Sequence, residues 1–125
     1  MNDVLHSRES LQETKVIVLM PTQGRPNELS RALESVRNQT RQPDGMVIVH
    51  ECETDLGGSD RTDWAWPAVF AANLRTHNLS GAVNQGIDEI LIRRLEWGLD
   101  PDSTYLALLD DDDWWDERYL EHCVA

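Results

Sequence analysis

The fold is decided by the stretch Tyr105-Leu106-Ala107-Leu108-Leu109-Asp110-Asp111-Asp112-Asp113-Trp114-Trp115, in which a short apolar run ends in four consecutive aspartates. A continuous apolar run of this length is typical of a buried strand in a parallel sheet. Ligands of open α/β sheets bind outside the carboxyl ends of the strands. We therefore expect the four acids to face a ligand site.

Two interpretations of the acids are open at this point. Four adjacent carboxylates repel one another, and Mg²⁺ or Mn²⁺ would relieve that repulsion while keeping coordination positions for water and phosphate. This favours a metal-diphosphate site. The simpler alternative is a helix N-terminus, with Asp113 as its N-cap and with Asp116 and Glu117 in its first turn. The two interpretations are compatible, because a cap needs only one of the acids.

Composition narrows the class of protein. The 125 residues suffice for one domain, which we place at 15–125 after a flexible lead-in at 1–14. A net charge of −12 argues against nucleic acid and anionic membrane surfaces as partners. Two cysteines without metal-ligand spacing, no apolar run of membrane-spanning length and no signal pattern predict a cytoplasmic location.

Strand and helix patterns alternate along the chain. Apolar runs predict strands at 15–20, 46–49, 69–72 and 105–109. Between them, a helix at 27–38 would bury Leu29, Ala32, Leu33 and Val36, and a second, capped by Ser80, would bury Val83, Ile87, Ile90, Leu91 and Leu95. Strand, helix and strand in sequence make parallel βαβ units. The predicted fold is α/β, a Rossmann-like half-domain with a mostly parallel central sheet flanked by helices.

Three loops should therefore meet at the carboxyl edge of this sheet, at 21–25, 50–55 and 110–113. Thr22 can donate a hydroxyl group and Gln23 an amide to a ligand, and Arg25 can pair with a phosphate in a bidentate fork. Glu51 and Asp55 are acceptors suited to a base N–H or to ribose hydroxyls. Each residue taken singly is unremarkable, and their joint arrival at one edge predicts a nucleotide site.

The same motifs resemble the first half of a family 2 glycosyltransferase of the GT-A fold. The first loop, Pro21-Thr22-Gln23-Gly24-Arg25, is similar to that family's Pro-Thr-Tyr-Asn-Arg, and the following helix shares its Leu-x-x-Ala-Leu-x-Ser-Val-x-x-Gln-Thr pattern. The second strand ends in Val49-His50-Glu51-Cys52-Glu53-Thr54-Asp55, where the family has Val-Asp-Asp-Gly-Ser-Thr-Asp. Val83-Asn84-Gln85-Gly86-Ile87 resembles the third motif, and Leu109 to Trp115 the Leu-Asp-x-Asp-Asp hallmark.

The resemblance implies an inverting transferase that uses Mn²⁺ or Mg²⁺ and a UDP-, GDP- or dTDP-sugar, with an acceptor that the sequence does not identify. By position it implies Asp112 as the most direct metal ligand, with Asp110 and Asp113 beside it. With the residues from the loops, the predicted nucleotide-binding set is Pro21, Thr22, Gln23, Arg25, Glu51, Asp55, Asn84, Asp110 and Asp111.

The chain also departs from the family pattern. Gln23, Gly24 and His50 stand where the family has Tyr, Asn and Asp, and family members continue well beyond the hallmark to a catalytic base that cannot be named in this chain. We therefore expect a truncated GT-A domain that supplies the donor half. Its exposed sheet edge would favour homo-oligomers.

Two other classes of protein are alternatives to the transferase. The first is a non-catalytic nucleotide- or protein-binding module descended from such an enzyme. The second is a phosphoacceptor domain or phosphatase, which would need its acids after the first strand, where Pro21-Thr22-Gln23 stands instead.

Overall fold

A computed structural model describes residues 14–58 and 63–124. Of the predicted lead-in, only Thr14 is among them. The elements in chain order are β1 (Lys15–Thr22), α2 (Pro26–Arg37), β2 (Gly45–His50), the 3₁₀ helix η1 (Glu53–Leu56), β3 (Ala68–Ala72), α3 (Leu79–Arg93), β4 (Thr104–Leu108) and α4 (Tyr119–Val124). The four strands form one parallel sheet in the order β3-β2-β1-β4, which confirms the predicted α/β class.

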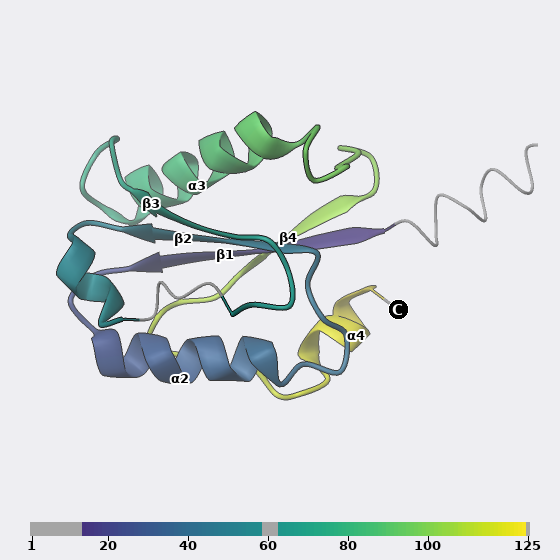
Figure 1. Cartoon of the computed structure of the whole chain (residues 1–125), viewed down its shortest axis with the longest axis horizontal. Helices are drawn as coiled ribbons and strands as arrows, with labels where there is room; N and C mark the ends of the chain where they lie inside the picture. Colours follow the sequence, from purple (N-terminus) through teal and green to yellow (C-terminus); the bar gives the residue numbers. More distant parts are fainter. Residues whose placement is uncertain (1–13, 59–62, 125) are drawn as a thin grey trace, which may run out of the picture.

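The two central strands separate two apolar layers. Side chains of successive strand residues point to opposite faces of a sheet. In β1, Val16, Val18 and Met20 pack with α2 on one face, whereas Ile17 and Leu19 pack with α3 on the other. Figure 1 shows α3 on one side of the sheet and α2 with α4 on the opposite side. The sheet is thus enclosed between helices, and its carboxyl edge is left to the loops.

Helix α2 follows the predicted pattern. Its buried residues are Leu29, Ala32, Leu33 and Val36, as the helical spacing indicated. Pro26 is the first residue of the helix, where a backbone N–H would have no partner within the helix, so its absence in proline loses no hydrogen bond. Gly24, just before it, has a φ of 64°, a conformation that glycine adopts without strain.

Helix α3 differs from the prediction in its cap and in its buried face. Its N-cap is Asn78, not Ser80. The predicted face was wrong in part: Ile90 is buried, but Leu91 and Leu95 are 55% and 88% exposed. The residues that α3 buries are Gly81, Ala82, Gln85, Gly86 and Ile90. Small residues there bring the helix close to the sheet, because a Cβ on Gly86 would stand 2.7 Å from the side chain of Leu19.

Strand β4 is an edge strand, which corrects the expectation of a buried one. Its partner on one side is β1, and Tyr105, Leu106 and Leu108 are 58%, 43% and 55% exposed. An apolar run identifies a strand but not its place in the sheet, and β4 has no neighbour beyond it among residues 14–58 and 63–124. The buried end of the run is Leu109, which is 2% exposed.

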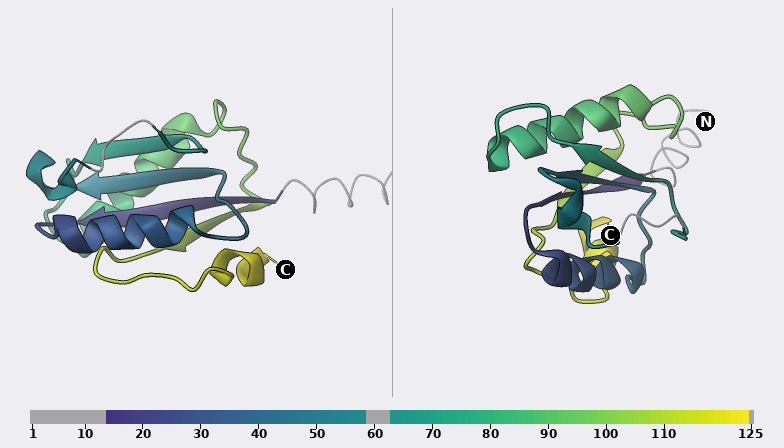
Figure 2. Two further views of the ribbon diagram at one scale, coloured as in Figure 1. Left: turned by 60° about the horizontal axis from the view of Figure 1, so that its bottom comes forward. Right: turned by 60° about the vertical axis from the view of Figure 1, so that its left-hand side comes forward.

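The segment after the acids crosses back under α2 before it becomes helical (Figure 2). Ser35 Oγ accepts a hydrogen bond from the backbone of Trp115, and buried Gln39 bonds the carbonyl of Asp116 and the N–H of Leu120. Helix α4 then begins at Tyr119, so Asp113 as an N-cap was wrong. No helix in the described part of the chain is long and apolar enough to cross a membrane.

Candidate functional site

A cavity of about 350 Å³ opens at the carboxyl edge of the sheet, where the three predicted loops meet. Its lining includes eight of the predicted site residues, namely Pro21, Thr22, Gln23, Arg25, Glu51, Asp110, Asp111 and Asp112. Three other predicted residues, Asp55, Asn84 and Asp113, do not line it. The loops therefore converge at one edge of the sheet, as the parallel topology requires.

Asp111 points inward and ties the first loop to the acidic loop. Its carboxylate accepts hydrogen bonds from the Thr22 hydroxyl at 2.9 Å, from the Gln23 backbone N–H at 3.2 Å and from Arg25 Nη1 at 3.2 Å. Asp111 and Thr22 are only 5% and 4% exposed. Hydrogen bonds to a buried carboxylate are strong, and the buried Thr22 hydroxyl would be costly to leave without its acceptor. Asp111 therefore fixes the shape of the cavity.

Asp110 and Asp112, on either side of Asp111, are exposed and line the cavity. Arg25 lies 2.9 Å from Asp112 and partly offsets its charge. Within the described residues, no group of three or more His, Cys, Asp or Glu side chains is arranged to hold a metal ion unaided. Two outward carboxylates nevertheless suit Mg²⁺ or Mn²⁺, because such ions are commonly held by one or two carboxylates together with substrate phosphates.

Asp55 does not line the cavity but organises the second loop. It is 5% exposed and accepts hydrogen bonds from the backbone N–H groups of Gly24, Glu51 and Cys52 at 2.8, 3.1 and 2.9 Å. These bonds join the loop after β1 to the loop after β2. The contacts give Asp55 a structural role, and its predicted contact with nucleotide stays a prediction.

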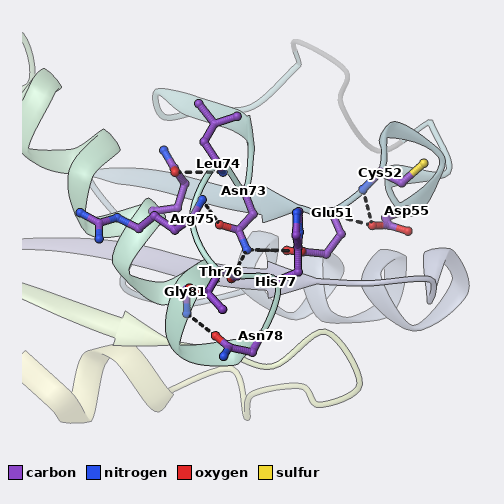
Figure 3. Close-up of polar contacts among 11 residues, drawn as sticks. Glu51, Cys52, Asp55, Asn73, Leu74, Arg75, Thr76, His77, Asn78 and Gly81 are labelled. Carbon is purple, nitrogen blue, oxygen red and sulfur yellow. Dashed lines mark hydrogen bonds and ion pairs between the residues drawn. The ribbon is translucent and has the colours of Figure 1, made fainter.

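Glu51 lines the cavity from the loop after β2 and is held by two side chains from the loop after β3 (Figure 3). Asn73 Nδ2 lies 3.3 Å from Glu51 Oε1 and 3.0 Å from Oε2, and His77 Nδ1 lies 2.6 Å from Oε1. The same loop is anchored to α3 by Arg75, which donates two hydrogen bonds to Asp88 and thereby lowers the pKa of that carboxyl group.

Five residues of the site were not predicted from the sequence. Asn78, Leu79 and Ala82 line the cavity, and Asn73 and His77 position Glu51. Asn78 Oδ1 accepts the N–H of Gly81 at 2.7 Å, and an Asn directly before a helix is a capping signal that could have identified it. Nothing local in the sequence marks Asn73 or His77, because their partner is 22 or 26 residues away.

Two comparisons with known proteins found similar sequences. The model of the family described as glycosyl transferase family 2 matches residues 17–125. Over 113 residues the chain is 25% identical to a protein described as glycosyltransferase GlyA, from Streptococcus pneumoniae serotype 4. That alignment covers 89% of this chain and 15% of the relative, so the chain spans only a small part of the relative's length.

Proposed function

Since the chain belongs to glycosyl transferase family 2, we propose that it supplies the donor-binding part of an enzyme that transfers a sugar, with inversion, from a nucleotide-diphospho-sugar to an acceptor. The observation that carries the proposal is the cavity at the sheet edge, whose two ends differ in chemistry. By the strand order, one end holds the carboxylates that follow β4, with Arg25 beside them, and the other end holds Glu51, which follows β2. The apolar Leu79 and Ala82, from α3, also line the cavity.

The acidic end suits a diphosphate bound through a cation. A phosphate cannot approach Asp110 and Asp112 unaided, because all three groups are negative. Mn²⁺ or Mg²⁺ held by these two carboxylates, with Asp113 following them in the chain, would complete its coordination with phosphate oxygens. Arg25 can then pair with a phosphate oxygen. When bound, the cation would act as a Lewis acid that neutralises the departing diphosphate.

The other end suits a nucleoside. Leu79 and Ala82 offer a small apolar surface to a ring, and Glu51 offers only hydrogen-bond acceptors when it is ionised. Pro21, Thr22 and Gln23 run between the two ends, where a ribose would lie. The proposed ligand therefore lies along the first loop, with its phosphates toward Asp112.

Calorimetric titration of UDP, GDP, CDP and dTDP, each with and without Mn²⁺, tests the proposal. We expect at least one nucleotide to bind, and to bind tightly only with the metal. Asp112→Asn should weaken that binding at least about tenfold, since a ligand to the metal is lost. Asp102→Asn is the matched control, because it makes the same change in an exposed acid just before β4, outside the cavity lining. Absence of binding for all four nucleotides would overturn the proposal.

Catalysis by this chain is a separate question from donor binding. The relative is much longer than the part that this chain matches, so the acceptor and the transfer step are proposals for the whole enzyme. Metal-dependent binding without hydrolysis or transfer of any nucleotide-sugar would favour the non-catalytic module instead. Radiolabelled donors incubated with the protein and Mn²⁺ distinguish the two.

A further inference from the structure

The surroundings of Glu51 restrict which base can occupy the nucleoside end. An ionised carboxylate has about four positions at which it can accept a hydrogen bond, two on each oxygen. The Glu51 side chain is 15% exposed, so water satisfies few of them. The donors that a base needs for binding to Glu51 therefore depend on which acceptor positions of the carboxylate the protein already occupies.

Asn73 closes the fork between the two carboxylate oxygens. A single nitrogen at 3.3 Å from Oε1 and 3.0 Å from Oε2 must lie between the oxygens on their open side. Asn73 is 4% exposed and cannot easily leave, because its amide also donates to the Thr76 carbonyl at 2.9 Å and accepts from the Arg75 N–H at 2.9 Å. The position that normally takes two parallel donors is thus filled by the protein.

His77 fills one of the two outer positions. Its Nδ1 lies 2.6 Å from Oε1, on the oxygen that Asn73 also contacts (Figure 3). The His77 side chain is 72% exposed, yet its partner is well shielded. Among the residues that the structure describes, none is bonded to the remaining outer position, on Oε2, which we take as the place of a ligand.

We propose, on the premise that the cavity binds a nucleotide, that Asn73 and His77 make Glu51 specific for a base with a single ring N–H donor, that is, for uracil or thymine nucleotides. Their N3–H can donate to the free position on Oε2. Guanine presents two adjacent donors, N1–H and its amino group, and needs the fork that Asn73 closes. Cytosine and adenine present a ring nitrogen lone pair at the corresponding place, which the carboxylate repels.

The test is a calorimetric comparison of UDP, dTDP, GDP and CDP in the presence of Mn²⁺. We expect UDP and dTDP to bind at least about tenfold more tightly than GDP and CDP, because a shielded polar group that is left mispaired weakens binding. Glu51→Gln should lower the UDP-to-CDP affinity ratio to about one, since an amide can donate to the ring nitrogen of cytosine. Glu53→Gln, the same change in an exposed acid of the same loop, should leave the ratio unaltered.

A second variant tests the part assigned to Asn73. Asn73→Ala opens the fork, and we expect it to raise the affinity for GDP relative to UDP by about fivefold or more. Circular dichroism will show whether this variant folds, and the nucleotide series on the wild-type protein decides the inference even if it does not. Equal affinities for UDP, GDP and CDP would overturn the inference and leave the donor-binding proposal standing. Binding of no nucleotide would overturn both.

Discussion

Replacing Asp111 by Ala should destabilise the protein by about 2–4 kcal/mol. The largest part comes from the Thr22 hydroxyl, which is 4% exposed and would lose its acceptor, at a cost of about 1–3 kcal/mol. The Gln23 N–H is on an exposed residue and can turn to water, which limits its share to about 0.5 kcal/mol. Arg25 is half exposed and keeps its contact with Asp112, so its share is under about 1 kcal/mol.

Two further variants separate the buried carboxylate from its neighbours. Asp111→Asn keeps an oxygen for Thr22 and should cost only about 1 kcal/mol, since the half-exposed Arg25 can turn away from the new amide. Asp112→Asn should change stability by less than about 0.5 kcal/mol, because Asp112 is 54% exposed and removing its charge also relieves repulsion among the acids.

Urea unfolding followed by circular dichroism at neutral pH, without added metal, measures all three variants. The free energies of unfolding should fall in the order Asp112→Asn, Asp111→Asn, Asp111→Ala, from most to least stable, at a common m-value. If Asp111→Ala is no less stable than Asp112→Asn, the carboxylate does not hold the two loops together and the reasoning fails.

Two other predictions concern the sheet. Gly86→Ala should lower stability by about 1–3 kcal/mol, measured by thermal unfolding, because the new methyl group would meet Leu19 at 2.7 Å; an unchanged melting temperature would mean that α3 can lift away from the sheet without cost. We also predict self-association through the edge of β4, which no other strand covers within residues 14–58 and 63–124. Leu108→Lys should reduce it in sedimentation velocity, since a lysine on an edge strand discourages pairing; a monomeric wild-type protein would contradict this.

The sequence was sufficient to predict the βαβ unit and the edge at which its loops meet. In β1 and β2 every core residue belongs to a continuous apolar run, and the spacing of Leu29, Ala32, Leu33 and Val36 matches the face that α2 buries. Such local patterns are decided within one element. The position of β4 was not predictable in this way, because an edge strand and a central strand can carry the same apolar run, and only the neighbours decide its exposure.

Contacts between loops that are distant in the chain could not be predicted from the sequence either. Asp55 was predicted as a ligand residue from its place after a strand, yet it accepts three backbone N–H groups within the protein. Asn78, and not Ser80, caps α3, and this depends on the position of the loop that joins β3 to α3. The hydrogen bond from Asn73 to Glu51 helps to hold that loop in place. A carboxylate near a site can thus bind the ligand or hold the surrounding loops together, and the protein groups around it determine which of these roles it has.

The four aspartates show what the sequence pattern does not decide. Leu109 and Asp111 are buried at 2% and 5%, whereas Asp110 and Asp112 are exposed. The chain turns here, because the Asp113 N–H donates to the Asp110 carbonyl at 3.1 Å, so the alternation of an extended strand does not apply. The inward place of Asp111 depends on the turn and on its donors Thr22, Gln23 and Arg25, and the two acids that flank it are the pair that can meet a cation together. Substituting all four aspartates at once would reduce stability and ligand binding together. Single substitutions at Asp111 and Asp112 are therefore needed to separate the structural role of Asp111 from the proposed metal-binding role of Asp112.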